Sequence, residues 1–345
     1  MPLTISAQDG LVDQITYFNN RVASRDVSNY YLVYNGEFAY NKSTSDGYPF
    51  GAVKRLDWYE KGVLSTLYIV FALKHPEKDD SDFMTVFYDT DRWHRGVAER
   101  AAEGARNHGL LNISADDFFD IDTTMPEDKV EQEKIGRLLK KLDTLITLHQ
   151  RKYEKLVNIK KSMLDKMFPQ NGASVPEIRF KGFTDPWEQR KLGEVFEEYS
   201  EKNHAELPPL TIIQGGGTIR RDESERALQY DKSSLSNYKM VNKDDFIVHL
   251  RSFEGGLEKA SSQGIISPAY HTFHGEDVDS RFYYAYFRSK NFINKDLKPH
   301  VYGIRDGRSI DIEGMKTIRI PWASYPEQKS IGDFLTHLDT LITLH

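Results

Sequence analysis

The sequence predicts an α+β protein in which two globular domains are separated by long, nearly identical helices that pair as a coiled-coil-like spacer. Three observations support this fold class. The chain has 345 residues, which is more than the roughly 250 to 300 residues over which a single core grows. It also contains an internal repeat, and each copy of the repeat carries apolar side chains at a helical, seven-residue spacing.

The repeat joins two segments that lie far apart in the chain. Residues 131–149 read EQEKIGRLLKKLDTLITLH and residues 327–345 read EQKSIGDFLTHLDTLITLH, so 13 of 19 positions are identical. Upstream regions correspond more loosely, since Pro-Leu-Thr-Ile occurs at both 2–5 and 209–212. Because the period is much longer than that of a solenoid, the repeating unit is a whole domain followed by a helix.

The first globular domain is predicted at residues 1–125. It alternates short runs rich in Tyr, Phe, Val and Ile with turns of Gly, Asn, Asp and Ser. This pattern is typical of short strands, which we expect at 30–33, 67–71 and 83–88, with a helix at 91–103. We expect this domain to be incomplete at its N-terminal end, because its counterpart begins further upstream in the repeat.

The first spacer helix and its linker are predicted at residues 126–171. Thr124 provides a cap, and Pro126 and Glu127 follow it in the first turn. The helix should continue to about Met167, before a breaker-rich segment. The apolar stripe needs a partner helix, so we infer an antiparallel or crossed pairing of the two copies. The residues expected to pack in the spacer are Ile135, Leu138, Leu142, Leu145, Ile146, Leu156, Ile331, Leu335, Leu338, Leu341 and Ile342.

The second globular domain is predicted at residues 172–324, with strands at 210–213, 246–250 and 270–273 and a helix at 280–287. The second spacer helix follows at residues 325–345, and we expect it to be incomplete at its C-terminal end. His149 and His345 interrupt the two apolar stripes at equivalent positions. We interpret both histidines as packing residues of the helix seam.

Composition excludes several classes of protein. The chain has no cysteine, which excludes a disulfide framework, thiolate zinc sites and cysteine nucleophiles. Its formal net charge is −6, which argues against a protein that coats nucleic acid by itself, because such binding depends on many contacts from Lys and Arg to phosphates. No apolar run approaches the length of a membrane span. We therefore expect a soluble, cytoplasmic protein with no membrane partner.

Catalytic motifs are also absent from the sequence. Gly215 to Gly217 lacks the Lys-Ser/Thr of a phosphate loop and the spacing of a dinucleotide loop, so we interpret it as a turn. Zinc-helix, nucleophile-elbow and base-binding Pro-Pro-aromatic motifs do not occur. Glu127-Asp128-Lys129 has the spacing of some nuclease metal sites, but acidic residues are favoured in a first helical turn. We expect no catalytic residue, metal or cofactor in this chain.

Several sequence segments resemble the DNA-specificity (S) subunit of type I restriction-modification enzymes. They are PEIRFKGF at 176–183, WEQRKLGE at 187–194, and the repeated helix at 327–344. NGEFAYNKS at 35–43 and GYPFGA at 47–52 resemble a target-recognition domain of that family. The resemblance covers essentially the whole chain, and its motifs are specific in combination.

The resemblance implies a non-catalytic subunit of a DNA adenine methyltransferase and restriction endonuclease complex. Each target-recognition domain would read one half of a bipartite site in double-stranded DNA, and the helices would act as a spacer. Two methylation (M) subunits that carry S-adenosylmethionine would dock on this scaffold. Restriction (R) subunits that use ATP and Mg would complete the assembly. A partner could then supply much of the phosphate neutralisation that this acidic chain lacks.

The candidate DNA contacts are polar and basic side chains on predicted loops. Arg305 and Arg308 flank Gly307, an arrangement suited to bidentate contact with guanine or to phosphate binding. The full set of candidates is Asn41, Lys42, Ser43, Tyr48, Lys54, Arg55, Arg220, Arg221, Arg251, Ser252, Tyr302, Arg305 and Arg308.

Two alternatives stay open at this point. The chain could be a coiled-coil scaffold that binds only proteins, or an inactive fragment of a specificity subunit with a regulatory role. A stand-alone nuclease or methyltransferase would require metal-dependent or methyl-donor-dependent activity from the purified chain.

Overall fold

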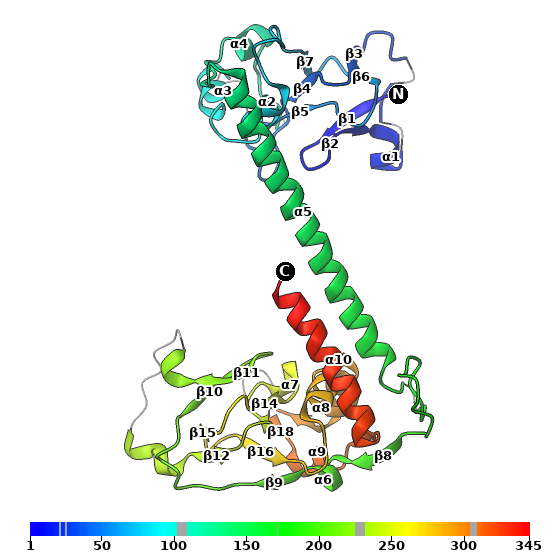
Figure 1. Ribbon diagram of the computed structural model, residues 1–345, viewed down its shortest axis with the longest axis vertical. Coiled ribbons are helices and arrows are strands. Elements are labelled where there is room, and N and C mark those ends of the chain that lie inside the picture. Colours follow the sequence, from blue (N-terminus) through cyan, green and yellow to red (C-terminus); the bar gives the residue numbers. More distant parts are fainter. Residues whose placement is uncertain (21, 25, 102–108, 171, 225–231, 304–308) are drawn as a thin grey trace. The chain divides into compact units, whose positions relative to one another are not determined.

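The computed structural model divides into two compact units, Met1–Leu148 (unit 1) and His149–His345 (unit 2) (Figure 1). The structure describes all residues except 21, 25, 102–108, 171, 225–231 and 304–308. Within this described part, no helix is both long and apolar enough to cross a membrane.

The described residues of unit 1 form three small antiparallel sheets. Its strands are β1 (Leu3–Ser6), β2 (Gly10–Asp13), β3 (Tyr31–Tyr34), β4 (Phe38–Asn41), β5 (Ala52–Arg55), β6 (Lys61–Leu64) and β7 (Ile69–Phe71). β1 pairs with β2, β3 pairs with β6, and β4 lies between β5 and β7. Its short helices are α1 (Gln14–Phe18), α2 (Ser81–Tyr88), α3 (His94–Arg100) and α4 (Ala115–Phe119).

Strand β4 is the centre of unit 1 because both of its faces are buried. Successive side chains of a strand point to opposite faces. Phe38 and Tyr40 accordingly enter one hydrophobic cluster, together with residues of α2, α3 and α4, while Ala39 enters a second cluster that contains Leu3 and Leu11. β4 therefore joins the two cores of the unit.

The predicted strand at 83–88 is wrong, because this segment forms helix α2. The Asp80 carboxylate accepts a hydrogen bond from the Phe83 backbone N–H at 2.8 Å and caps the helix N-terminus. Phe83, Met84 and Phe87 are buried, and their one- and four-residue spacing matches one face of a helix. A short run of apolar residues does not distinguish a buried strand from a short buried helix.

The long helix α5 (Lys129–Lys166) contains 38 residues, which corresponds to about 57 Å at 1.5 Å per residue. Its predicted end is confirmed, but it begins at Lys129 rather than directly after Thr124. The Asp128 carboxylate accepts a hydrogen bond from the Val130 backbone N–H at 2.9 Å. The predicted capping residue Thr124 therefore lies outside the helix, and Asp128 satisfies one of the free first-turn donors.

The described residues of unit 2 form five sheets and five further helices. Its strands are β8 (Glu188–Lys191), β9 (Glu197–Tyr199), β10 (Leu210–Ile213), β11 (Gly217–Arg220), β12 (Lys239–Val241), β13 (Phe246–Val248), β14 (Glu258–Lys259), β15 (Gly264–Ile266), β16 (His271–His274), β17 (Val301–Tyr302), β18 (Ser309–Ile310) and β19 (Arg319–Trp322). The larger sheet has the order β14-β13-β16-β9, and the others pair β10 with β11, β12 with β15, β17 with β18 and β19 with β8.

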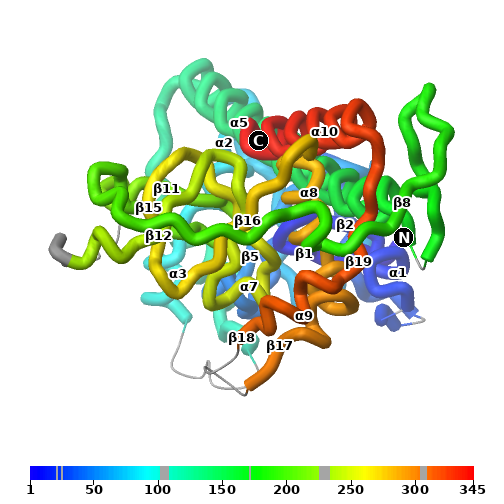
Figure 2. The backbone as a smooth tube through the Cα atoms, turned by 90° about the horizontal axis from the view of Figure 1, so that it is seen from below, coloured from blue at the N-terminus to red at the C-terminus, as the bar shows by residue number. Residues whose placement is uncertain are grey.

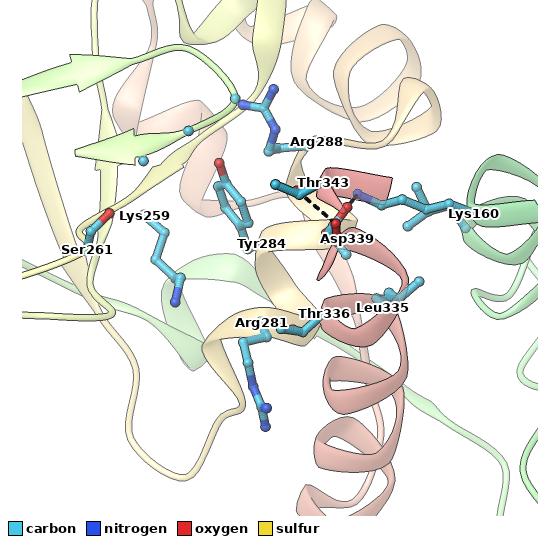
Figure 3. A pocket seen from close by; sticks show the side chains of 15 residues that line it. Lys160, Lys259, Ser261, Arg281, Tyr284, Arg288, Leu335, Thr336, Asp339 and Thr343 are labelled. Atoms are coloured by element: carbon cyan, nitrogen blue, oxygen red, sulfur yellow. Dashed lines mark hydrogen bonds and ion pairs between the residues drawn. The ribbon is translucent and has the colours of Figure 1, made fainter. Parts of the chain in front are cut away.

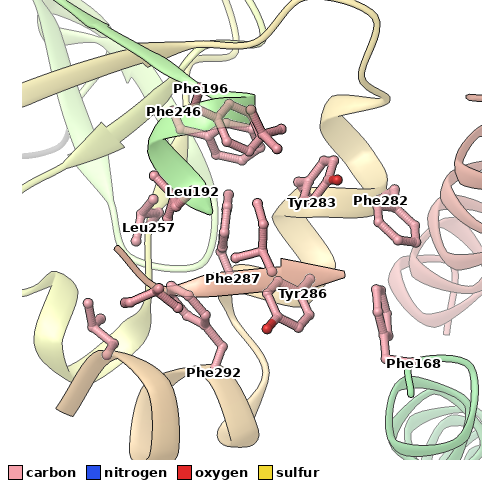
Figure 4. Packing of buried hydrophobic residues seen from close by; sticks show 14 of the residues in the cluster. Phe168, Leu192, Phe196, Phe246, Leu257, Phe282, Tyr283, Tyr286, Phe287 and Phe292 are labelled. Carbon is pink, nitrogen blue, oxygen red and sulfur yellow. The ribbon is translucent and has the colours of Figure 1, made fainter. Parts of the chain in front are cut away.

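The helices of unit 2 pack around an aromatic core. They are α6 (Leu192–Val195), α7 (Ser252–Gly255), α8 (Ser280–Phe287), α9 (Ile312–Lys316) and α10 (Tyr325–Thr343), with short helical turns η1 (Arg221–Glu223), η2 (Lys232–Asn237), η3 (Phe292–Leu297) and η4 (Lys298–His300). Figure 4 shows rings of α8 beside Phe196, Phe246 and Phe292. The rings of Phe246 and Phe287 meet edge to face with centroids 5.1 Å apart, a favourable aromatic geometry.

The two units repeat the same strand scaffold. Pro2 forms an isolated parallel bridge with Val63, and Pro209 forms the same bridge with Ile265. In both units the Pro-Leu-Thr-Ile word therefore begins the first strand of a hairpin. β13 also repeats the central position of β4, since Phe246 and Val248 enter one cluster and Ile247 enters another. The loose upstream correspondences in the sequence thus reflect a common fold.

The repeated helices dock on their units through the same glutamine. Gln132 of α5 accepts a hydrogen bond from the Asp80 backbone N–H at 2.8 Å and donates to the Pro126 carbonyl at 2.8 Å. Gln328 of α10 accepts from the Asp279 backbone N–H at 3.0 Å and donates to the Ala323 carbonyl at 2.8 Å. Asp80 and Asp279 are the N-caps of α2 and α8. Each glutamine therefore links the repeated helix to the N-cap of an earlier helix of its unit, α2 or α8.

A repeated glycine makes this docking close. At Gly136 an added Cβ would lie 2.6 Å from the Phe83 backbone nitrogen, and at Gly332 it would lie 2.6 Å from the Asp279 carboxylate. Such distances exclude a larger side chain without movement of the neighbouring helix. The identity of these positions in the two copies is therefore a packing requirement.

Within unit 2, α10 runs antiparallel to the C-terminal part of α5 (Figures 1 and 2). Lys160 forms an ion pair with Asp339, and further along the seam the Nδ1 atoms of His149 and His345 lie 3.0 Å apart. The two helices pair antiparallel and both histidines lie at the seam, as predicted, but the part of α5 that pairs with α10 begins at about His149 and is not the repeated copy at residues 131–149.

The predicted spacer packing is correct only in part. Ile331, Leu335 and Leu338 are buried, Leu341 and Ile342 are half-buried, and Ile135 and Leu156 pack at the edges of the cores of their units. In contrast, Leu138, Leu142, Leu145 and Ile146 are exposed. The reason is that α10 covers α5 only from about His149 onward, so the stripe before His149 has no partner helix in the described part of the chain.

Candidate nucleic-acid interface

Unit 2 gathers an arginine, two tyrosines and a histidine from four separate segments. The Arg221 guanidinium lies 5.6 Å from the centroid of the Tyr238 ring, and its Nη1 donates to the Tyr238 hydroxyl at 3.4 Å. The rings of Tyr270 and His249 meet edge to face with centroids 6.1 Å apart. Burial raises the pKa of Tyr270, and the charge of Arg221 acts on it in the opposite direction. We name Arg221, Tyr238, Tyr270 and His249 the tyrosine cluster.

The loop after β13 borders the tyrosine cluster and has a fixed shape. The His249 backbone N–H donates to the Ser252 hydroxyl at 2.9 Å, and the Ser252 backbone N–H donates to the His249 carbonyl at 3.0 Å. This reciprocal pair leaves Leu250 and Arg251 exposed between them. Ser252 itself is fully buried. Its hydroxyl shapes the loop that presents Arg251, and its DNA contact stays a prediction.

His249 is a member of the cluster that the sequence analysis missed. Its Nδ1 accepts a hydrogen bond from the Arg251 backbone N–H at 3.3 Å, so the ring proton lies on Nε2. Nε2 is buried and has no hydrogen-bond partner within the described residues. Burial lowers the pKa of His249, and the nearby positive charges of Arg288 and Arg251 lower it further. The one sequence signal for His249 was its position directly after a run of apolar residues that forms a buried strand.

The glycine turn of the β10–β11 hairpin is held by a buried carboxylate. Glu258 is fully buried and accepts hydrogen bonds from the backbone N–H groups of Gly215 at 2.6 Å and Gly217 at 3.1 Å. The Tyr284 hydroxyl also donates to it at 2.8 Å, and Arg288 forms an ion pair with it. The predicted turn is confirmed. Its anchor on β14 could not be predicted from the glycines, because the contact spans 41 residues or more of sequence.

Arg220 and Tyr302 are both exposed. Arg220 ends β11 and forms two hydrogen bonds with Asp222, at 3.1 and 2.8 Å. Tyr302 is exposed on the β17–β18 hairpin, which α7 contacts. Arg305 and Arg308 lie outside the described residues. The structure therefore brings Arg221 and Arg251 next to the same aromatic cluster, and it keeps Arg220 in a local ion pair.

A cavity of about 700 Å³ lies between the glycine turn, α8 and the paired helices of unit 2. Figure 3 shows Lys160 and Asp339 on one side of this cavity, with Tyr284 and Lys259 facing it from other elements. Four basic side chains line it, but each forms an ion pair with a carboxylate of the chain. These pairs are Lys160–Asp339, Lys259–Asp244, Arg281–Asp279 and Arg288–Glu258. The positive charges around the cavity are therefore already neutralised by carboxylates of the chain, so the cavity is not a free anion-binding site.

The basic candidates of unit 1 are engaged inside the unit. Lys54 forms an ion pair with Asp89 at 2.7 Å, and Arg55 forms ion pairs with Asp57 at 2.6 Å and Asp82 at 2.9 Å. Only 15% and 11% of these two basic side chains are exposed. The structure thus gives Lys54 and Arg55 the role of fixing β5 to α2, in place of the free DNA contacts that were predicted.

The polar candidates of unit 1 also have internal partners. The Asn41 carboxamide accepts a hydrogen bond from the Ser43 backbone N–H at 3.0 Å. Lys42 Nζ lies 3.4 Å from the Ile113 carbonyl, and the Tyr48 hydroxyl donates to the Ala7 carbonyl at 3.3 Å. These contacts order the segment after β4. They do not gather the predicted residues into one basic surface.

Unit 1 instead exposes aromatic side chains that the sequence analysis did not select. Trp58 is 74% exposed, on a turn whose Asp57 and Tyr59 carbonyls both accept hydrogen bonds from the Asn35 carboxamide at 3.1 Å. On the neighbouring strand β3, Tyr31 and Tyr34 are also exposed. The two units therefore present different chemistry from the same scaffold.

Comparisons with known proteins agree with the resemblance inferred from the residues. No protein-family model matches the chain. The chain is 24% identical over 304 residues to the type I restriction enzyme MjaVIII specificity subunit of Methanocaldococcus jannaschii, which covers 83% of this chain and 69% of that protein.

Two solved structures were also matched. The HsdS subunit from Thermoanaerobacter tengcongensis is 14% identical, with 91% of this chain and 75% of that chain covered and a TM-score of 0.44. The type I restriction-modification system S subunit from M. genitalium is 14% identical, with coverages of 90% and 78% and a TM-score of 0.47. The predicted resemblance is confirmed by the sequence match to the curated protein: over most of its length, this chain is similar to the specificity subunit of a type I restriction enzyme.

Proposed function

We propose that the chain is a DNA-specificity subunit that reads a bipartite double-stranded target, one half with each unit, and has no catalytic activity of its own. One observation carries this proposal. The same strand scaffold presents arginine, tyrosine and histidine in unit 2 and exposed aromatic side chains in unit 1. Bases are distinguished by side chains at groove edges, so two different surfaces on one scaffold suit two different half-sites.

The partners and cofactors of the proposed assembly lie outside this chain. We propose that two methylation subunits, which bind S-adenosylmethionine, use the chain as their scaffold, and that restriction subunits supply the chemistry that needs ATP and Mg. Arg251 and Arg221 then serve DNA recognition only. The length of α5 supports a spacer role, because a continuous helix transmits a fixed length from one end to the other.

The test is a selection from a random duplex library at fixed salt, with the chain alone and with its cognate methylation subunit. The expected product is a split motif whose two halves are separated by a constant, unspecified gap. Two matched variants test the side chains. Arg251→Ala should weaken the base preference in one half of the motif, with a loss of about 1–3 kcal/mol in the discrimination for the preferred base. Arg95→Ala is the control, because Arg95 is exposed and, among the described residues, its ion pair is with Glu99 on its own helix.

The outcome against this proposal is the absence of any enriched motif in both mixtures. The remaining candidate is then a scaffold that binds only proteins, which the exposed apolar stripe of α5 favours. A stable complex with the methylation subunit, without sequence enrichment, would establish that alternative.

A further inference from the structure

The turn between β10 and β11 presents a polar side chain to solvent. The buried Glu258 carboxylate fixes the turn through the backbone N–H groups of Gly215 and Gly217, which have φ values of +84° and +74°. Gln214 precedes these glycines and is exposed, and its carboxamide forms no hydrogen bond with the described residues. A carboxamide on a fixed backbone thus offers both a donor and an acceptor to a ligand.

The segment after β13 lies against this turn. A Cβ added to Gly255 of α7 would collide with the Gln214 carboxamide, so the carboxamide lies directly on the α7 backbone. α7 begins two residues after Leu250, and the Gly255 backbone N–H lies 3.4 Å from the Arg251 carbonyl. Leu250 is 65% exposed. Two elements in contact therefore present an exposed carboxamide and an exposed apolar side chain.

Unit 1 builds the corresponding loop with a different side chain. Counted from the first residue of the central strands β4 and β13, Asn41 corresponds to His249. Each of these side chains accepts a hydrogen bond from the backbone N–H two residues later, at 3.0 and 3.3 Å respectively. The residue between the two partners is Lys42 in unit 1 and Leu250 in unit 2. The hydrogen bond that shapes the loop is thus repeated, whereas the side chain within it changes.

We propose that Gln214 and Leu250 determine the base preference of unit 2 and read an A·T pair in the major groove of duplex DNA. Gln214 accepts a hydrogen bond from the adenine N6 amino group and donates one to adenine N7, the bidentate contact that carboxamides make with adenine. Leu250 packs against the thymine C5-methyl group at the same groove edge. This inference rests on the proposed DNA-recognition function and assigns two residues and a base pair to it.

The chemistry of the two side chains favours an A·T pair over other targets. The major-groove edge of guanine offers two acceptors and no donor, so adenine is the base that matches both the donor and the acceptor of Gln214. Cytosine has no C5-methyl group for Leu250 to contact. Neither side chain is charged, so neither neutralises a phosphate in the way that Lys and Arg do.

The experiment uses the full chain with its cognate methylation subunit, and duplexes that carry the motif selected from the random library. In one series each adenine in turn is replaced by 7-deazaadenine, which lacks the N7 acceptor, and in a second series each thymine is replaced by uracil, which lacks the methyl group. Binding is measured by fluorescence anisotropy at fixed salt. One 7-deazaadenine should weaken binding by about two- to tenfold, and one uracil by about fourfold.

Two variants assign these effects to the side chains. Gln214→Ala should abolish the effect of 7-deazaadenine and keep that of uracil, and Leu250→Ala should do the reverse. Both side chains are exposed, so the fold should survive, and circular dichroism melting verifies this. Gln150→Ala and Leu67→Ala are the matched controls, because they remove exposed side chains of the same types outside this surface. Both controls should leave the two analogue effects unchanged.

The outcomes separate this inference from the proposed function. If a motif is selected but its adenines and thymines tolerate the analogues, or if each variant keeps the effect that it should abolish, the roles of Gln214 and Leu250 are overturned while DNA recognition stands. If no motif is selected by the chain with its partner, the proposed function fails, and this inference fails with it.

Discussion

Replacement of Gln328 by alanine should destabilise unit 2 by about 2–6 kcal/mol. The side chain is fully buried and forms two hydrogen bonds, one from the Asp279 backbone N–H at 3.0 Å and one to the Ala323 carbonyl at 2.8 Å. Gln328→Ala leaves both backbone groups buried without a partner, and each such loss costs about 1–3 kcal/mol. Because Asp279 caps α8, the first turn of α8 should open with it.

Chemical unfolding followed by tryptophan fluorescence measures this effect, and hydrogen exchange locates it at α8. Gln132→Ala provides a replicate in unit 1, because Gln132 forms the equivalent two bonds at 2.8 Å each. Gln150→Ala is the matched control, since Gln150 is exposed on α5. If Gln328→Ala changes the free energy of unfolding by less than about 0.5 kcal/mol, the range of ordinary surface changes, the docking role of the repeated glutamine is refuted.

Three further outcomes are expected. Glu258→Ala should cost about 3–5 kcal/mol of unfolding free energy, as is typical when one partner of a buried ion pair is removed, and exchange of the Gly215 and Gly217 amides should accelerate in step. The pKa of His249 is lowered in the folded state, so the unfolded chain binds more protons. The free energy of unfolding should therefore be highest above about pH 6.5 and fall as the pH drops below that value. His249→Phe should reduce this fall in the urea midpoint, and an unchanged fall would count against the role of His249. Insertion of four residues after Leu142 lengthens the helix by about 6 Å and should widen the unspecified gap of the selected DNA motif by about one or two base pairs; a constant gap would argue against a spacer.

The repeat and the long helices could be predicted from the sequence because their signals are local. Thirteen identical letters and a regular apolar spacing define α5 and α10 without knowledge of the rest of the chain. The segment at 83–88 could not be assigned in this way, because its helix depends on the Asp80 cap and on the Gln132 contact 52 residues later. Exposure of Leu138 and Leu142 also depends on which helix lies beside them, and periodicity cannot indicate that.

The candidate DNA contacts were harder to predict because residue type does not reveal how a charge is used. Lys54 and Arg55 have the composition of a phosphate contact, yet carboxylates 2 to 35 residues away neutralise them. Ser252 is a loop serine by sequence and a buried hydrogen-bond acceptor in the structure. Arg221 and Arg251 remain candidates, because Arg221 lies over the Tyr238 ring and Arg251 is exposed next to His249, to which its backbone N–H donates.

The repeated glutamine and glycine contacts make each recognition unit an interchangeable part. Every docking interaction of α5 with unit 1 at Gln132 and Gly136 has a counterpart in α10 with unit 2 at Gln328 and Gly332. A unit that keeps the capping aspartate and the closely approaching turn of α2 or α8 can therefore be joined to either helix without a new interface. Under the proposed function, exchange of a whole unit would then create a new pair of half-sites, while the helical frame stayed the same.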